Sequence, residues 1–366
     1  MSRSDFKTST KEHQLVLFSQ RGSLNSSLNQ GVTDHLKAEL GEFVSLWLND
    51  DPCLEVSTSG STGAPKIIKV LKEGMINSAV MTCSFLDLPK HSTALLCMPL
   101  KFIGAKMVVV RSMVASLELV AVEPSSHPLE SLDFSPFFAA MTPAQVMNCF
   151  DNEHDLTILK GIKKLIIGGG AVSAELEEKL AMLDNEVYST YGMTETLSHI
   201  ALKQLRPVST ENYRLFDGVN VSLSDRNTLV INSKALGVYN LETNDIVELF
   251  RDRSFRVLGR TDNTINSGGI KIQIEVAERL LEKAFSFDFA FSFVPDAVLG
   301  QKAVLLCNCK DTDKIKAICR ELLPKYWSPK HILYTESIPK TQSGKIARAS
   351  VMELACKLYR KSSECI

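Results

Sequence analysis

The chain has 366 residues, of which 45% are hydrophobic and 23% charged, and its 41 Lys plus Arg nearly balance 42 Asp plus Glu. The length exceeds one typical domain and suits two. The composition excludes wholesale disorder and a collagen-like chain, and the balanced charge excludes a nucleic-acid-binding protein that relies on overall basicity. No apolar run reaches the about 18 residues of a membrane span, and the polar start MSRSDFKTSTKEHQ lacks an apolar signal core. We therefore expect a cytoplasmic protein.

The nine cysteines are scattered, and none forms a CxxC pair. Cys307 and Cys309 lie in the run AVLLCNC, which predicts a buried strand. Without clustered histidines this pattern favours free thiols in a reducing compartment over a zinc site.

The first predicted element is a helix over residues 33–50, which Thr33 caps. Its apolar residues recur with a period of about 3.6 and predict one buried face. These residues are Leu36, Leu40, Val44, Trp47 and Leu48.

From about residue 54, short apolar runs alternate with helical stretches, which predicts buried strands of an α/β sheet. The expected strands are 94–98, 107–110, 119–122, 137–141 and 164–167, and the expected helices include 75–86 and 173–184.

After residue 213 the predicted strands follow one another without helical stretches between them. Runs at 229–232, 245–250 and 255–259 predict an antiparallel meander. The polar, glycine-containing segment 259–269 is the best boundary between domains. Alternation then resumes, with helices at 275–285 and 313–323 and strands at 287–294 and 302–309.

The loop STSGSTGAPK at 57–66 carries two glycines, five hydroxyl residues and one lysine. Glycines let several backbone N–H groups turn toward one anion, and hydroxyls and a lysine add donors and charge. The loop therefore predicts a site for nucleotide phosphates. Its spacing differs from the GxxxxGK[ST] pattern, which excludes a P-loop kinase or GTPase.

Four further segments are individually weak signals. YSTYGMTETLSH (188–199) offers an aromatic face and a carboxylate suited to Mg²⁺, and LIIGGGAV (165–172) ends a strand with three glycines. TNDIVEL (243–249) begins a strand with an acidic residue, and PKTQSGKIAR (339–348) presents a lysine at a loop edge.

Taken in order, these motifs resemble the adenylate-forming acyl-CoA synthetase superfamily over roughly residues 54–350. The resemblance implies an α/β fold, with a large N-terminal α/β domain and a small C-terminal α+β domain joined by a hinge. We accordingly place the adenylation domain at 1–259, the hinge at 260–263 and the mobile domain at 264–366. The resemblance also implies ATP, Mg²⁺ and a carboxylic acid as ligands, with CoA as co-substrate.

The same resemblance implies a role for each matching residue. The phosphates of ATP would meet Thr58, Ser59, Gly60, Ser61, Thr62, Gly63 and Lys66; the adenine would lie against Gly169, Gly170, Ala171, Tyr191 and Gly192; Thr194 would touch the α-phosphate, Glu195 would hold Mg²⁺, and Asp245 and Arg260 would hold the ribose. Lys345 would be the catalytic lysine of adenylation, Asp262 the hinge residue, and Gly268, Gly269 and Lys271 would form the CoA channel.

The chemistry fits these roles. A carboxylate attacks the α-phosphorus of ATP and pyrophosphate leaves, so charge on the transferring and leaving groups needs stabilisation by a metal, a lysine and backbone N–H groups. Rotation about the hinge would then exchange Lys345 for the 267–272 segment before the thiol attacks.

Within the superfamily, GGIKIQIEVAERLL and MTPAQVMNCF most resemble o-succinylbenzoate–CoA ligases of menaquinone biosynthesis. This substrate has two carboxylates, so one needs a cation or donors of its own. Four residues depart from the family pattern: Lys101 and Phe102 stand where many members have a His or another aromatic, Ile274 replaces Pro, and Val276 replaces Glu. The acid-pocket candidates are Lys101, Lys106, Arg111, Thr142 and Gln145.

Several alternatives stay open. The adenylation motifs do not separate this activity from another aryl- or fatty-acyl-CoA synthetase or from a ligase that loads a carrier protein. A silent nucleotide- or acyl-binding protein is a different class, and retention of the charged motif residues argues against it. A homo-oligomer is open as well; a nucleic-acid ligase lacks its lysine motif here.

Overall fold

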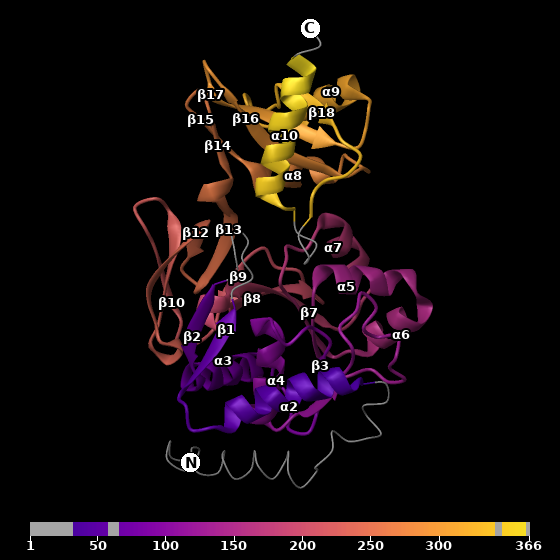
Figure 1. Ribbon diagram of the computed structural model, residues 1–366, viewed down its shortest axis with the longest axis vertical. Helices are drawn as coiled ribbons and strands as arrows, with labels where there is room; N and C mark the ends of the chain where they lie inside the picture. The colour runs from indigo at the N-terminus through magenta and orange to yellow at the C-terminus, as the bar shows by residue number, and fades with distance from the viewer. Residues whose placement is uncertain (1–31, 58–65, 341–345, 364–366) are drawn as a thin grey trace. The chain divides into compact units, whose positions relative to one another are not determined.

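The structure is a computed structural model that describes residues 32–57, 66–340 and 346–363 (Figure 1). It divides into two compact units. The first comprises the described parts of 1–172, 176–220 and 232–240, and the second comprises 173–175, 221–231 and the described parts of 241–366. The predicted hinge, 260–263, falls inside the second unit, and the boundaries proposed from the sequence stay predictions.

The first unit is built on parallel strands that alternate with helices. Its central strands follow the order β4-β3-β5-β6-β7, all parallel, and β8 and β9 continue antiparallel. The elements are α2 (Asp34–Leu48), β1 (Cys53–Ser57), β2 (Ile67–Leu71), α3 (Lys72–Phe85), β3 (Thr93–Leu96), α4 (Ile103–Ala115), β4 (Glu118–Ala121), β5 (Phe138–Met141), α5 (Pro143–Asn148), α6 (Glu153–Gly161), β6 (Lys164–Ile167), α7 (Ala174–Leu180), β7 (Glu186–Met193), β8 (Ser198–Arg206) and β9 (Tyr213–Leu215), with 3-10 turns η1 (Cys149–Asp151), η2 (Thr194–Thr196) and η3 (Lys234–Leu236).

Helices bury apolar faces against this sheet. Leu95, Ala139 and Leu165 of neighbouring strands pack in one cluster with Leu176 and Leu180 of α7. Such burial stabilises by about 25 cal/mol per Å² of apolar surface, which makes the parallel strands the rigid part of the unit. The predicted site residues of this unit come directly after β6 and at the end of β7, two strands that contribute to this core.

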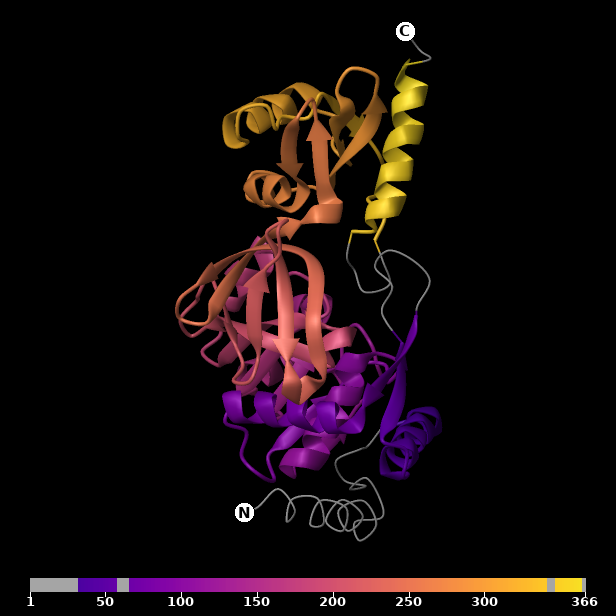
Figure 2. The same cartoon turned by 90° about the vertical axis from the view of Figure 1, so that its left-hand side faces the viewer.

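The second unit combines a meander with a three-layer α+β arrangement. In the smaller sheet, β16 and β17 alternate their side chains, so that Phe291 and Leu305 pack with α8 and α9 while Ala290 and Val304 pack with α10. Figure 2 shows α10 on the opposite side of this sheet from α8 and α9. The elements are β10 (Asn220–Leu223), β11 (Thr228–Ser233), β12 (Val238–Phe250), β13 (Ser254–Arg260), η4 (Thr261–Asn263), β14 (Thr264–Ser267), β15 (Ile270–Gln273), α8 (Ile274–Glu282), β16 (Phe289–Asp296), β17 (Gly300–Cys307), α9 (Thr312–Leu322), β18 (His331–Tyr334) and α10 (Arg348–Ser363).

The sequence predictions for the elements are confirmed with one clear exception. The run 107–110, expected to be a strand, lies inside helix α4, where it is buried. A buried helix is apolar on all sides, so a short apolar run does not distinguish it from a strand. In α2, Thr33 caps the helix as predicted, but Phe43 is buried there, whereas the predicted Val44 and Leu48 are only half-buried.

Within the described residues no helix is long and apolar enough to cross a membrane. The cysteines that the structure describes are all free, and Cys307 is buried at the end of β17 as the apolar run predicts.

Candidate active site

The phosphate-loop residues 58–63 lie outside the described residues, but the segments that flank them do not. β1 and β2 pair antiparallel, and Ser57 faces Ile67 at the last position of the register. Lys66 is exposed just before β2. The hairpin therefore holds the two ends of the predicted loop close together.

Lys345 also lies outside the described residues, but the residues on either side of 341–345 are described. Lys340 and Ile346 form an antiparallel bridge, and the Ala347 N–H donates to the Pro339 carbonyl at 2.9 Å. The described residues that flank the predicted catalytic lysine are thus paired with each other.

The glycine run after β6 exposes backbone at the carboxyl end of the parallel strands. The Gly168 N–H donates to the Met141 carbonyl at 3.0 Å, and a Cβ at Gly168 would lie 2.5 Å from Thr190 Oγ1. Gly169 has φ +80°, which favours glycine. Ligands of open α/β sheets bind at this edge, so the position suits the predicted role of Gly169, Gly170 and Ala171.

The YGMTET motif forms a tight turn between β7 and β8. A Cβ at Gly192 would collide with the Ser198 carbonyl and His199 Cα, so only glycine fits. Thr196 Oγ1 accepts from the Met193 N–H at 3.0 Å and lies 2.7 Å from the Ser198 carbonyl. The turn buries Thr194 and leaves Glu195 exposed.

Tyr191, the predicted neighbour of the adenine, is half-buried. Its ring centroid lies 5.7 Å from that of Tyr213 at an interplanar angle of 58°. The Tyr213 hydroxyl is in turn 3.1 Å from Ser189 Oγ. Packing against a second, anchored ring restricts the tyrosine and provides a firm flat surface.

The surroundings of Glu195 fit a magnesium ion that is shared with phosphate groups. Mg²⁺ in nucleotide sites is held by one or two carboxylates together with phosphate oxygens, rather than by a cage of protein ligands. Glu195 is an exposed carboxylate on the rigid turn, and the part of the chain that the structure describes contains no group of three His, Cys, Asp or Glu residues placed to hold a metal.

Arg111 lies just behind this turn and is 1% exposed. Its Nη2 donates to Ser198 Oγ at 3.0 Å, and its Nε has no hydrogen-bond partner. Burial lowers the guanidinium pKa to about 10, although Cys83 acts in the opposite direction. Among the described residues no carboxylate lies within ion-pair distance of Arg111. Within residues 32–57, 66–340 and 346–363, the side chain is thus a buried cation without a carboxylate partner.

The other acid-pocket candidates have local partners. Thr142 and Gln145 form the capping box of α5, and the Gln145 amide also donates to the Cys97 and Ser125 carbonyls at 3.0 and 2.9 Å. Lys101 and Lys106 lie over the rings of Phe102 and Phe43, 5.1 and 5.0 Å from their centroids. The Gln145 amide is already hydrogen-bonded within the protein, so a contact with the acid would compete with these bonds.

In the second unit, Asp245 and Arg260 face each other across β12 and β13, as their predicted common role requires. Arg260 Nη1 donates to Asp245 Oδ1 at 3.1 Å, while Nε and Nη2 donate to the two Asp262 oxygens at 2.9 and 2.7 Å. Partial burial opposes ionisation of Asp262, but the bonds from Arg260 outweigh it and lower the pKa. The predicted ribose residues and the predicted hinge residue are thus one ion-paired group.

The predicted CoA-channel glycines form a hairpin turn between β14 and β15. Gly268 and Gly269 have φ +58° and +83°, the left-handed pair that a type I′ turn requires. Lys271 is exposed opposite Asn266. The hairpin alone explains why both residues are glycine.

The sequence reasoning missed several residues next to the site. Ser198 and His199 begin β8 one residue after the YGMTET motif, and the buried His199 imidazole contacts Thr82 of α3. A single arginine within the apolar stretch MVVVRSMV, together with a Ser-His pair after the motif, is the available signal. Also unpredicted is the bidentate pair of Arg348 and Glu278, which joins α10 to α8 at 2.6 Å.

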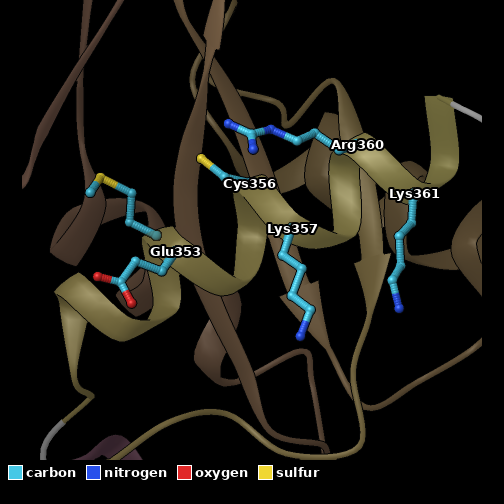
Figure 3. Close-up of a pocket in the computed structure, with 6 residues that line it drawn as sticks. Glu353, Cys356, Lys357, Arg360 and Lys361 are labelled. Atoms are coloured by element: carbon cyan, nitrogen blue, oxygen red, sulfur yellow. The ribbon is translucent and has the colours of Figure 1, made fainter.

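A hollow of about 470 Å³ lies on the outer face of α10 (Figure 3). All of its lining comes from that single helix, and none of it is a predicted site residue. The lining residues are Met352, Glu353, Cys356, Lys357, Arg360 and Lys361.

Comparison with protein families gives two matches. A model described as AMP-binding enzyme matches residues 5–231, and one described as AMP-binding enzyme C-terminal domain matches residues 289–345.

Three individual proteins illustrate the similarity. The 2-succinylbenzoate–CoA ligase of Listeria monocytogenes is 24% identical over 346 residues, which cover 88% of this chain and 73% of the relative. The structure of an acyl-CoA synthetase (AMP-forming)/AMP-acid ligase II-like protein from Dyadobacter fermentans is 33% identical, covers 85% of this chain and 91% of the other, and superposes with a TM-score of 0.59. The o-succinylbenzoate coenzyme A synthetase of Bacillus subtilis, in complex with ATP and a magnesium ion, is 19% identical, covers 81% and 69%, and has a TM-score of 0.68, which concerns the fold alone.

Proposed function

The chain belongs to the AMP-binding enzyme family, and from that premise we propose that it is an AMP-forming acid–thiol ligase acting on o-succinylbenzoate. In the first half-reaction a carboxylate oxygen bonds to the α-phosphorus of ATP, the bond to the bridging oxygen breaks, and pyrophosphate leaves. In the second, the thiolate of CoA attacks the acyl carbon and AMP leaves. The similarity to 2-succinylbenzoate–CoA ligases supports the acid, at 24% identity.

The nucleotide roles proposed from the sequence are compatible with the described geometry. Glycine backbone at the end of β6 and the ring of Tyr191 suit an adenine, and the buried Thr194 hydroxyl suits a phosphate oxygen. Glu195 would hold Mg²⁺, which when bound neutralises charge on the phosphates. Lys345 and residues 58–63 are proposed on their motifs alone.

The hinge is proposed at 260–263 with Asp262 as its central residue, between domains at 1–259 and 264–366. The Arg260–Asp262 pair supports this assignment. A hinge residue must change its backbone angles, and Asp262 is held by hydrogen bonds from the Arg260 side chain, which can break and form again during such a change.

The observation that carries the choice of acid is Arg111. A buried cation without a counter-ion costs several kcal/mol, which a bound anion can offset. The guanidinium bonds to Ser198, four residues after Thr194, so its charge acts on ligands at the turn. In a monocarboxylate, the single carboxylate bonds to the α-phosphorus and no second anionic group remains. A dicarboxylate keeps a second carboxylate, for which Arg111 is the proposed partner.

The test is pyrophosphate release from ATP and Mg²⁺ with o-succinylbenzoate, benzoate, acetate and a medium-chain fatty acid, each with and without CoA. We expect strong, CoA-stimulated turnover with o-succinylbenzoate alone. Preference for another acid would overturn the substrate, and adenylation that CoA does not stimulate would point to a carrier-protein acceptor. No turnover with any acid would point to a silent binding protein.

A further inference from the structure

A chain of four polar side chains connects α3, α4 and β8 behind the YGMTET turn. Arg111 Nη2 lies 3.0 Å from Ser198 Oγ, which lies 3.2 Å from His199 Nδ1. His199 Nε2 lies 3.0 Å from Thr82 Oγ1, which lies 3.1 Å from the Ser78 carbonyl. Thr82, Arg111 and His199 are all buried, so these contacts replace water rather than compete with it.

Counting protons gives the chain a direction. Arg111 can only donate, and the Ser78 carbonyl can only accept. Each hydroxyl has one proton, so four bonds form only if Ser198 donates to Nδ1, Nε2–H donates to Thr82, and Thr82 donates to Ser78. The opposite tautomer, with Nδ1–H, makes three of these bonds, and the Ser78 carbonyl then keeps only its helical bond from the Thr82 N–H. The structure therefore selects neutral His199 with its proton on Nε2.

The surroundings of His199 keep it neutral. Burial lowers its pKa well below the usual value, and the charge of Arg111 lowers it further. The other groups that face this region are the Cys83 thiol on α3 and the ring of Phe216, whose centroid is 5.4 Å from the imidazole. Neither supplies the negative charge that an imidazolium would need.

We propose that His199 is a positioning residue for Arg111. By accepting the hydrogen bond from the Ser198 hydroxyl, His199 Nδ1 turns a lone pair of Ser198 Oγ toward Arg111 Nη2, and this fixes the rotation of the guanidinium. The inference rests on the proposed function, in which Arg111 attracts the second carboxylate of the acid. A guanidinium that is held in place binds a carboxylate without first losing rotamer freedom, so the chain sets specificity for a diacid.

Two substitutions separate this role from simple packing. His199→Gln keeps an acceptor for Ser198 and a donor for Thr82, whereas His199→Leu keeps the bulk and removes both. We expect His199→Leu to raise the KM for o-succinylbenzoate about tenfold, the value of one net hydrogen bond, because the Arg111–Ser198 bond loses its orientation, with kcat and the KM for ATP changed less than about twofold. His199→Gln should stay within about threefold of the natural enzyme in all three.

Ser198→Ala tests the same chain without touching the histidine, and should match His199→Leu. Thermal unfolding of each variant reports whether it folds. Equal KM values for the acid in the natural enzyme, His199→Leu and Ser198→Ala would overturn the proposal, as would a rise in the KM for ATP as large as that for the acid.

A second measurement does not depend on activity. In protein labelled with ¹⁵N at histidine, the His199 signals at pH 7.5, assigned by their loss in His199→Gln, should show protonated Nε2 and unprotonated Nδ1. A protonated Nδ1 would overturn the chain itself. If instead the tautomer is as expected but the natural enzyme does not turn over o-succinylbenzoate, the proposed function fails and the role toward the acid fails with it.

Discussion

Two arginines of the predicted site, Arg111 and Arg260, have opposite electrostatic surroundings. Arg260 bonds two carboxylates, Asp245 and Asp262, and its side chain remains 36% exposed. Arg111 is buried, and its Nη2 donates to a neutral hydroxyl, that of Ser198. The charge of Arg260 is therefore neutralised within the protein and organises the 260–263 segment. Arg111 has no carboxylate partner among the residues that the structure describes, and a buried cation of this kind is stabilised by a bound anion.

The largest effect is expected for the substitution of Arg111. Arg111→Met should lower kcat/KM for o-succinylbenzoate about 30-fold or more, because a buried charge-assisted contact is worth about 2–5 kcal/mol when one partner is removed. The free energy of unfolding should be unchanged or higher, since an unpaired buried charge is replaced by an apolar side chain of similar length. Steady-state kinetics and urea unfolding measure the two quantities.

Lys106→Met is the matched control in the same helix. Its ammonium group lies over the Phe43 ring, so its removal should change kcat/KM less than about threefold. A larger loss for Lys106→Met than for Arg111→Met would transfer the carboxylate site to Lys106.

Arg260→Met tests the arginine that pairs with two carboxylates. It leaves Asp245, which is 8% exposed, without its cation, and we expect a loss of about 2 kcal/mol in the free energy of unfolding, together with a higher KM for ATP. Arg226→Met is the control, because Arg226 forms an exposed pair with Glu242 at 2.7 Å whose loss should cost under about 1 kcal/mol. Equal losses in the two variants would mean that the Asp245–Arg260 pair is an ordinary surface ion pair.

The same comparison explains what could be predicted from the sequence. The Asp245–Arg260 contact follows from an antiparallel meander, because its two strands are adjacent in the chain and their register brings the motif residues opposite each other. The Arg111–Ser198 contact joins positions 87 apart in the chain. Such a pairing depends on how α4 packs against β8, and no local pattern encodes that.

The failure at 107–110 has the same origin. The run was expected to be a strand because it is apolar and short, yet Gly104, Ala105 and Lys106 before it belong to the same helix, α4. If residues 107–110 formed a strand, Arg111 would lie at the end of that strand. In the observed helix α4, Arg111 is instead a charged side chain within a buried helix, where it needs a polar partner. The motif residues were recognisable from sequence, but the groups that position them were not.

The smallest expected effect is a dependence of stability on pH, and the two regions differ in where it occurs. The pKa of His199 is lowered in the folded protein, so below the ordinary value of 6.5 the unfolded chain binds a proton that the native state does not. Stability should therefore fall as the pH is lowered from 7.5 to 5.5, with a slope from this group of at most about 1.4 kcal/mol per pH unit. His199→Gln should remove that part of the slope.

Asp262 acts in a separate window. Its pKa is lowered below 3.8, so the Arg260 pair stabilises the protein fully above that value and is lost only as the pH falls through the lowered pKa. Between pH 7.5 and 5.5, Asp262→Asn should therefore shift the free energy of unfolding without changing its slope, whereas His199→Gln should change the slope. Urea unfolding at four pH values distinguishes these results. If the slope of His199→Gln equals that of the natural protein, His199 is not held neutral, and the directed chain from Arg111 to the Ser78 carbonyl is wrong.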